Sequence, residues 1–329
     1  MVKALVYTGV QRSEIQDVEL TQPEADQVVV DLAFCGLCGS DMHAWHGHDE
    51  RRVPPLVLGH EAVGVVEDGH LKGKRVAINP LMTCGRCPAC LGKREHLCPH
   101  RELIGMRVPG AFAEKVVIAE RNLTLLPDHL SFREAALAEP LACSVHGVRL
   151  ALEGATFDPD AEVVILGGGA IGLLAAFVFR HEGFANIRIA ETSPHRRQLV
   201  EDLGLASTYD PRETAPAASS IDIVYDAVGS KITRKASSDL ARPGGTIVHI
   251  GLQDNEGGLD TRKLTLQEIR FRGTYCYQEA DFATAIDLLA RGIVSGEDWA
   301  EIRPLDDGAG AFIDVHNGTA PPKIILETR

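Results

Sequence analysis

Residues 163–172 read VVILGGGAIG and indicate the fold more clearly than any other segment of the chain. An apolar run of strand length leads into Gly167, Gly169 and Gly172, and a segment of helical length follows. In this G-x-G-x-x-G spacing the first glycine permits a tight turn and the second lets the backbone approach a pyrophosphate. The third lets the helix pack closely on the strand. The pattern predicts the first strand, turn and helix of a dinucleotide-binding domain.

The identity of the dinucleotide depends on the end of the next predicted strand. Glu191 lies there, 19 residues beyond Gly172. A carboxylate at this place can accept hydrogen bonds from the adenosine ribose hydroxyls and repels a 2′-phosphate, which favours NAD over NADP. Arg196 and Arg197 weigh the other way, because a nearby arginine can hold a 2′-phosphate. A purely structural turn and a helix-capping Glu191 are the alternatives. The candidate cofactor-binding residues are Gly167, Gly169, Ala170, Ile171, Gly172, Glu191, Arg196, Val228 and Ile250.

Strands and helices alternate from about residue 142 onward. This alternation implies right-handed βαβ units and a parallel sheet. The sequence therefore predicts an α/β, doubly wound domain around the glycine motif. The strands are expected at 163–166, 187–190, 222–226 and 246–250, and the helices at 171–180, 194–203 and 232–240.

The residues before the change of pattern read mostly as short strands separated by Gly and Pro clusters. They suit an irregular barrel or sandwich. The C-terminal tail adds a helix at 281–291 and a strand at 323–326, and it is too short to form a domain of its own. We therefore expect it to complete the first domain. The early strands are expected at 2–7, 28–34, 62–67, 75–78 and 112–118.

Four cysteines lie within fifteen residues, with the spacing C-x2-C-x2-C-x7-C. Four thiolates at such short separations suit the closed tetrahedral shell of a structural Zn²⁺. An iron–sulfur cluster and free thiols are the alternatives. Disulfides are disfavoured, because the N-terminal segment has no apolar signal-peptide core and a chain of this size does not need cross-links to stabilise its fold. The residues are Cys84, Cys87, Cys90 and Cys98.

A second set of metal-ligating residue types is scattered more widely. Cys38 lies in GLCGSDMH, His60 and Glu61 lie in GHE, and Glu139 lies in AEPLAC. One thiolate, one imidazole and one or two carboxylates can form a catalytic Zn²⁺ shell with a position left open for substrate. Such residues are common in any chain, so their types alone make them candidates only.

The composition of the chain limits the kinds of partner that it can bind. Its 329 residues are 45% hydrophobic and 24% charged, which is ordinary for a globular protein of two domains. The net charge of −13 argues against nucleic acid and an anionic membrane as partners. The longest uncharged stretch, 163–179, is shorter than the ~20 residues that a spanning helix needs. Eight cysteines without a signal peptide predict a reducing, cytoplasmic environment.

Five segments together resemble one known family. GLCGSDMH, LGHEAVGVV, the cysteine cluster, AEPLACSVH and VILGGGAIG follow one another as in the zinc-dependent medium-chain dehydrogenase/reductases. The resemblance covers the whole chain and is closest to the polyol branch, which includes sorbitol dehydrogenases. It implies a GroES-like catalytic zinc domain over 1–141 and 275–329 and a Rossmann NAD-binding domain over 142–274. It also implies a homodimer or homotetramer.

The resemblance also assigns roles to single residues. By motif match, Cys38 and His60 are expected to bind the catalytic zinc, and Glu61 is expected to exchange with water or substrate. Glu139 is expected to bind that zinc directly or through water. The cysteine cluster corresponds to the structural zinc site, which makes two zinc ions per chain. Ser40 and His43 correspond to the proton relay of the family.

The implied reaction is oxidation of a secondary alcohol of the polyol class to a ketone, with hydride transfer to NAD. Ala44 and Thr274 depart from the residues typical of sorbitol dehydrogenases, which puts sorbitol itself in doubt. Threonine, a vicinal diol and a sugar phosphate are alternative substrates, with Arg51 and Arg52 as candidate phosphate contacts. A dinucleotide-binding protein without catalysis is the remote alternative. His46 and His48 are expected to be loop residues near the substrate entrance.

Overall fold

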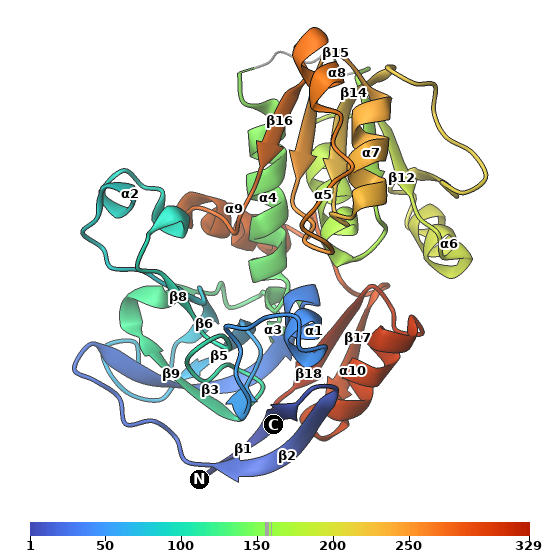
Figure 1. Ribbon diagram of the computed structural model, residues 1–329. Helices are drawn as coiled ribbons and strands as arrows, with labels where there is room; N and C mark the ends of the chain where they lie inside the picture. The colour runs from blue at the N-terminus through green and yellow to red at the C-terminus, as the bar shows by residue number, and fades with distance from the viewer. Residues whose placement is uncertain (155–157, 159) are drawn as a thin grey trace. The chain divides into compact units, whose positions relative to one another are not determined.

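The structure is a computed structural model that describes residues 1–154, 158 and 160–329. The chain divides into two compact units (Figure 1). Unit 1 comprises Met1–Glu139 and Gln278–Arg329, and unit 2 comprises Pro140–Tyr277. The fold class is as expected, since a mostly β part is combined with an α/β part that contains a parallel sheet.

Unit 2 is built on a parallel sheet whose central strand is β11 (Glu162–Leu166). The strand order is β13-β12-β11-β14-β15-β16, which is the 3-2-1-4-5-6 order of doubly wound dinucleotide-binding sheets. Val163, Val164 and Ile165 are fully buried, as expected for a parallel strand covered on both faces. The other strands are β12 (Asn186–Ala190), β13 (Ser207–Tyr209), β14 (Ile221–Asp226), β15 (Ala241–His249) and β16 (Arg270–Gly273).

Three helices of unit 2 begin after a side chain that accepts from one of their free N–H groups. The hydroxyls of Ser193 and Ser230 and the carboxylate of Asp260 each accept a hydrogen bond from the backbone N–H three residues later. α4 was not predicted from the sequence and begins in the last residues of unit 1. The helices are α4 (Ala138–Leu152), α5 (Ala170–His181), α6 (Pro194–Asp202), α7 (Lys231–Leu240) and α8 (Thr261–Leu266).

Unit 1 contains a sheet in the order β10-β6-β5-β3-β18-β17, with β9 also paired to β3. β18 (Lys323–Glu327) pairs antiparallel with β3 (Gln27–Gly36), so the C-terminal residues complete this sheet. Its other strands are β5 (Glu61–Val66), β6 (Arg75–Ile78), β9 (Lys115–Ala119), β10 (Leu123–Leu125) and β17 (Ala300–Pro304).

Aromatic side chains join two helices of unit 1 to each other and to the segment before β9. Trp45, in α1 (Gly39–Trp45), stacks on Phe312, in α10 (Gly308–Asn317), with 5.8 Å between ring centroids. Phe112 meets Phe312 edge to face, and all three rings are buried. The remaining elements are β1 (Val2–Gly9), β2 (Arg12–Val18), β4 (Leu56–Val57), β7 (Leu81–Met82), β8 (Glu102–Leu103), α2 (Pro88–Leu91), α3 (Phe132–Ala135), α9 (Glu279–Ala290) and three short 3₁₀ turns at Glu95–Leu97, Glu120–Asn122 and Leu305–Asp307.

Most predicted strands differ from the observed ones by one or two residues at an end, and two differ by more. The strand expected at 112–118 begins only at Lys115, because the backbone of Phe112 bonds instead to Leu58 and Leu5 outside that ladder. The strand expected at 246–250 begins at Ala241 and ends at His249. Ile250 lies beyond it, and its N–H donates to the carbonyl of Asp226. Among the described residues, no helix is long and apolar enough to cross a membrane.

The glycine turn makes a testable prediction. A Cβ on Gly172 would lie 2.0 Å from the carbonyl oxygen of Gly167, so Gly172→Ala must push the helix off the turn. We expect Gly172→Ala to destabilise the protein by about 1–3 kcal/mol and to weaken dinucleotide binding. Gly310→Ala is the matched control, because its Cβ meets nothing within 4 Å inside α10. There we expect about 0.5–1 kcal/mol of stabilisation in chemical denaturation. Equal stabilities for the two variants would contradict the role of Gly172.

Candidate functional site

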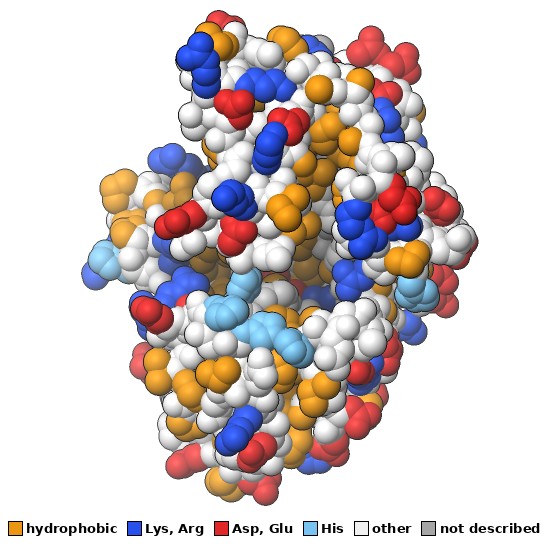
Figure 2. Space-filling view, turned by 45° about the vertical axis from the view of Figure 1, so that its right-hand side comes forward, with side chains coloured by type: hydrophobic (Ala, Val, Ile, Leu, Met, Phe, Trp, Pro, Cys, Tyr) orange, Lys and Arg blue, Asp and Glu red, His pale blue; other side chains and the backbone are white. Residues whose placement is uncertain are grey.

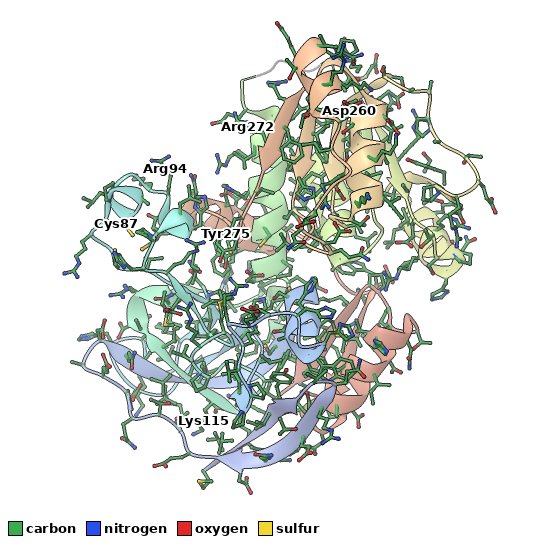
Figure 3. All side chains as sticks on the ribbon, viewed as in Figure 1. Cys87, Arg94, Lys115, Asp260, Arg272 and Tyr275 are labelled. Atoms are coloured by element: carbon green, nitrogen blue, oxygen red, sulfur yellow. The ribbon has the colours of Figure 1, made fainter. Side chains whose placement is uncertain are left out.

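The four-cysteine loop of unit 1 brings its sulfur atoms together around one point. The Sγ atoms of Cys87 and Cys90 are 3.5 Å apart, those of Cys98 and Cys84 are 3.5 Å apart, and those of Cys84 and Cys90 are 4.0 Å apart. Two sulfur atoms at 2.3 Å from one zinc ion and at a tetrahedral angle are about 3.8 Å apart. The observed spacings therefore fit a closed tetrahedral shell. Figure 3 shows these sulfur atoms gathered in the loop that carries the labelled Cys87.

Two thiols of this loop, those of Cys84 and Cys90, have pKa values that are shifted in opposite directions. The backbone N–H of Arg86 is the main cause that lowers the pKa of Cys84, to about 6. Burial, together with the neighbouring thiols of Cys87 and Cys98, raises the pKa of Cys90 to about 11. If all four sulfur atoms were ionised at these distances they would repel one another, so a cation between them would favour the thiolate forms. The donor set and its geometry both suit Zn²⁺.

A second group of possible metal ligands lies elsewhere in unit 1. Cys38 is the residue before α1, His60 directly precedes β5, and Glu61 is the first residue of β5. One ligand atom from each of the three lies within 4.8 Å of the other two. His60 and Glu61 are buried, while Cys38 is half-buried. A thiolate, an imidazole and a carboxylate held this closely fit a zinc ion with a position open to substrate.

Glu139, at the start of α4, is also buried. Burial is the main cause that raises the pKa of Glu139, to about 7, and the negative charge of Glu61 adds to it. The positive charge of His60 acts in the opposite direction. Glu139 therefore interacts electrostatically with His60 and Glu61, which are two members of the Cys38 group. A cation at that group would favour the ionised carboxylate.

Asp41 supports the Cys38 group from within α1. It is fully buried, and its carboxylate accepts hydrogen bonds from the N–H of Cys38 at 3.0 Å and from the N–H of Gly59 at 3.3 Å. Asp41 Oδ1 is also 3.4 Å from His60 Nδ1, which is too long to satisfy that nitrogen fully. A carboxylate facing Nδ1 favours the tautomer that leaves Nε2 free for a metal. Asp41 therefore caps the turn at the start of α1 and also contacts His60.

Lys323 pairs with Glu61 in the interior of unit 1. The ammonium group of Lys323 contacts Glu61 Oε2 and donates to the carbonyl of Leu37 at 2.9 Å. Both side chains are at most 2% exposed. Burial alone would lower the pKa of Lys323, but the charges of Glu61 and Cys38 outweigh it and raise the pKa. A Cβ on Gly36 would lie 2.1 Å from Glu61 Oε2, so a glycine is needed where the pair crosses β3.

Ser40 and His43 lie three residues apart on α1 and so share one face of the helix. Arg52 Nη2 is 3.4 Å from Ser40 Oγ, and Arg52 Nη1 donates to Asp49 at 2.7 Å. The guanidinium of Arg52 also donates to the carbonyl of Gly105. Arg52 is 3% exposed, so it is a buried side chain that supports the segment around Ser40.

The charges around His43 and Asp49 favour definite protonation states. Burial lowers the pKa of His43, and the positive charges of His48 and Arg52 lower it further, while Asp49 opposes them. Burial raises the pKa of Asp49, but hydrogen bonds from Arg51 and the charges of Arg51 and Arg52 bring it down to about 2. At neutral pH His43 is therefore neutral and Asp49 is ionised.

In unit 2 the predicted dinucleotide-binding residues meet at the carboxyl ends of the parallel strands. The glycine turn follows β11, Glu191 follows β12, Val228 follows β14 and Ile250 follows β15. Ligands of doubly wound sheets bind at this edge, where the strand order reverses. Gly167 has φ +102°, and a Cβ on it would lie 2.6 Å from Val228 Cγ2, so the two loops pack directly against each other.

Glu191 is held in place by the backbone on both sides of it. Its Oε2 accepts from the N–H of Gly168 at 2.8 Å and its Oε1 accepts from the N–H of Ser193 at 2.8 Å. The side chain is buried at 9% exposure. These bonds fix the carboxylate beside the glycine turn. Arg196 lies in the first turn of α6, where its N–H donates to the hydroxyl of Ser193.

Three supporting residues were missed by the sequence reasoning. Lys323 and Arg52 reach their partners Glu61 and Ser40, and Asp41 reaches His60. For Lys323 a signal was available, because a lysine in the apolar strand KIIL must find a partner when it is buried. Asp41 and Arg52 gave no such signal.

Comparison with known families matches both units. The alcohol dehydrogenase GroES-like domain matches residues 24–128, and the zinc-binding dehydrogenase domain matches residues 170–291. Together these ranges cover more than half of the chain, and they fall in the two units that carry the cysteine groups and the glycine turn.

Individual proteins resemble the chain over nearly its full length. A 2-dehydro-3-deoxy-L-galactonate 5-dehydrogenase of Pseudoalteromonas atlantica is 30% identical over 98% of either chain. A D-arabitol-phosphate dehydrogenase of Enterococcus avium is 32% identical, over 94% of this chain and 93% of its own. A solved structure, described as a zinc-binding dehydrogenase of Sinorhizobium meliloti bound to NADP, is 29% identical with a TM-score of 0.86, covering 99% of each chain.

Proposed function

The chain belongs to the zinc-dependent medium-chain dehydrogenases, and from this premise we propose that it oxidises a secondary alcohol of a polyol or sugar acid to a ketone, with NAD as hydride acceptor. The observation that carries the proposal is the group of Cys38, His60 and Glu61. Their ligand atoms lie within 4.8 Å of one another, in a chain that also has a complete dinucleotide turn. A protein that only bound a dinucleotide would have no use for such a group.

We assign the metal ligands by their geometry and chemistry, except that Glu139 is assigned from the motif resemblance and from its electrostatic interaction with His60 and Glu61. Cys38, His60 and Glu61 hold the reactive zinc, and Glu139 serves as a further ligand, either direct or through water. Cys84, Cys87, Cys90 and Cys98 hold a structural zinc. When bound, the reactive zinc supplies Lewis acidity that favours loss of the alcohol proton, and NAD accepts the hydride. The four-sulfur site is closed and takes no part in the reaction.

The chain itself supplies the route for the proton. Ser40 lies on the same helix face as His43, and its hydroxyl oxygen lies 3.4 Å from Arg52 Nη2. The hydroxyl passes the proton onward, and His43 receives it at a ring nitrogen before solvent takes it up. A receiver must be neutral, and the lowered pKa of His43 keeps it neutral at working pH.

This relay predicts a pH dependence. Since the pKa of His43 lies below 6.5, we expect kcat/KM for alcohol oxidation to fall only at pH values below 6.5, where His43 becomes charged. His48→Ala removes both burial and a positive neighbour, so it should move this fall to higher pH. His43→Ala should remove this fall at low pH and should lower kcat/KM by about 10- to 100-fold. If kcat/KM of His43→Ala fell at low pH in the same way, His43 could not be the residue that receives the proton.

We propose NAD as the preferred cofactor because the carboxylate of Glu191 is fixed at the ribose end of the glycine turn. Glu191→Ala removes that acceptor, so KM for NAD⁺ should rise by about 10- to 100-fold and the preference over NADP⁺ should fall. Glu182→Ala, an exposed acid in the same unit, is the matched control. An unchanged ratio of kcat/KM for the two cofactors in Glu191→Ala would contradict the proposal.

The arginines near the Cys38 group favour a substrate without phosphate. The guanidinium of Arg52 already donates hydrogen bonds to Asp49, Gly105 and Ser40. The guanidinium of Arg51 donates two hydrogen bonds to Asp49. Binding a phosphate would require these pairs to break. The similarity to a galactonate-type dehydrogenase therefore weighs more than the similarity to a polyol-phosphate dehydrogenase.

A substrate screen tests the proposed function. The zinc-loaded protein is supplied with NAD⁺ and, in turn, with polyols, sugar acids, vicinal diols, threonine and sugar phosphates, and NADH formation is followed by absorbance. We expect the largest kcat/KM among polyols or sugar acids, and none of that turnover in Cys38→Ser. Faster turnover of sugar phosphates would overturn the substrate class. Equal rates with and without Cys38 would overturn the assignment of the metal site.

We further propose that unit 1 is the catalytic zinc domain, that unit 2 is the NAD-binding domain, and that the protein forms a homodimer or homotetramer. Light scattering on the purified chain decides the oligomeric state. We also propose a cytoplasmic environment, because the cysteines grouped at Cys38 and at Cys84–Cys98 suit metal binding in a reducing compartment.

A further inference from the structure

Four histidines of unit 1 gather on one area of its surface. The rings of His46 and His316 are 5.1 Å apart between centroids, those of His46 and His48 are 5.6 Å apart, and those of His43 and His48 are 6.5 Å apart. Figure 2 shows histidine side chains following one another in a row on the face that it presents. His46 ends α1, His48 follows in the next loop and His316 lies in the last turn of α10.

We propose that His46 and His316, joined by His48, form a third metal site, which binds a divalent first-row transition-metal ion of octahedral or square-planar preference such as Ni²⁺. Imidazole nitrogen is a preferred ligand of these ions. The site shares no residue with the Cys38 group or the four-cysteine loop. It does not depend on the proposed reaction.

The central pair is already spaced for an ion. His46 Nε2 and His316 Nδ1 are 3.0 Å apart. Two nitrogen atoms about 2.1 Å from one ion and at right angles to each other are about 3.0 Å apart, which is the arrangement in octahedral and square-planar shells. Without an ion these nitrogens share one proton in a hydrogen bond. A bound ion replaces that proton with only a small outward turn of the rings.

The electrostatics of the cluster favour the ligand form of imidazole. Burial lowers the pKa of His46, and the charges of His316, His48 and His43 lower it further. Histidines this close to one another resist being protonated together, so His46 is neutral at neutral pH. Neutral imidazole is the form that binds metal ions.

The backbone on either side holds the pair in position. Trp45, the residue before His46, is buried and stacks on Phe312, four residues before His316. This contact fixes the end of α1 against α10, so little entropy is lost when an ion binds. His48 is exposed and follows Gly47, whose φ is +77°. In the described residues His48 does not yet complete a three-ligand group with the pair, and its side chain must turn to close on the ion.

The site is tested by titrating Ni²⁺ into the zinc-loaded protein, with calorimetry for affinity and metal analysis for zinc content before and after. We expect one Ni²⁺ to bind per chain without release of zinc. His46→Ala and His316→Ala should each weaken binding by at least about tenfold. His70→Ala, an exposed histidine of the same unit outside the cluster, should bind as the unchanged protein does.

A second readout guards against misfolded variants. Each variant is first compared with the unchanged protein by its unfolding temperature without Ni²⁺. Ni²⁺ should then raise the unfolding temperature of the unchanged protein and of His70→Ala, but not that of His46→Ala or His316→Ala. Equal Ni²⁺ affinity in the unchanged protein and His316→Ala would overturn the proposal. Ni²⁺ uptake matched by zinc loss would overturn it as well.

Discussion

Cys38→Ser is expected to abolish alcohol oxidation while the protein stays folded and keeps one zinc ion per chain. The serine hydroxyl does not ionise at neutral pH, so it cannot replace the thiolate beside His60 and Glu61. Loss of the reactive zinc removes several kcal/mol of transition-state stabilisation, which corresponds to a fall in kcat/KM of about 10³-fold or more. Zinc content by elemental analysis and turnover with the best substrate measure both effects.

Cys90→Ser serves as the contrasting variant, because Cys90 lies in the four-sulfur group. It should lower the zinc content as well, but its main effect should be a loss of stability, since a structural zinc contributes directly to folding. If Cys38→Ser kept full turnover and full zinc content, the reactive metal would have to lie elsewhere. If Cys90→Ser abolished turnover without loss of stability, the roles of the two groups would be exchanged.

Lys323→Met is expected to destabilise the protein by about 3–5 kcal/mol when no zinc occupies the Cys38 group, because it leaves Glu61 buried without a cationic partner. Lys323 contacts Glu61 inside unit 1, where both side chains are almost inaccessible to water. Lys115→Met is the matched control, since Lys115 pairs with Glu67 at a site where both side chains are about one-third exposed. That pair should contribute about 0–1 kcal/mol. Urea denaturation measures both values.

Two further results would separate this explanation from a simple loss of packing. Lys323→Met combined with Glu61→Gln should recover part of the lost stability, because the unpaired charge is gone. The pKa of Lys323 is raised in the folded state, so its contribution is fully present at pH values below about 10.4 and is lost as the pH rises through the folded value. A cost below 1 kcal/mol for Lys323→Met, or a double variant no more stable than the single one, would contradict the account.

The sequence predicted the parts of the protein whose physics is local. In the glycine turn, strand, turn and helix follow one another within 163–172, and the observed elements end within one residue of those expected there. The four cysteines are likewise close in sequence, so their spacing alone indicated a metal shell. The predicted α/β fold with a parallel sheet is confirmed.

Contacts between distant residues could not be predicted in the same way. Lys323 and Glu61 are separated by 262 positions and meet only because β18 joins β3 beside β5. Arg52 reaches Ser40 because the loop after α1 folds back over that helix. The start of α4 gave no clear amphipathic pattern, since Leu137, Ala138, Leu141 and Ala142 are all fully buried. For Cys38, His60, Glu61 and Glu139 the motif resemblance supplied what spacing could not, and their role as ligands remains a proposal.

The positions of the bound zinc ions can be measured in crystals of the protein. Anomalous scattering from crystals of the zinc-loaded protein, measured at the zinc absorption edge, should give two peaks per chain. One is expected among Cys38, His60 and Glu61, and the other at the centre of Cys84, Cys87, Cys90 and Cys98. A single peak, in the four-cysteine loop alone, from a protein that still oxidises alcohols would contradict the account.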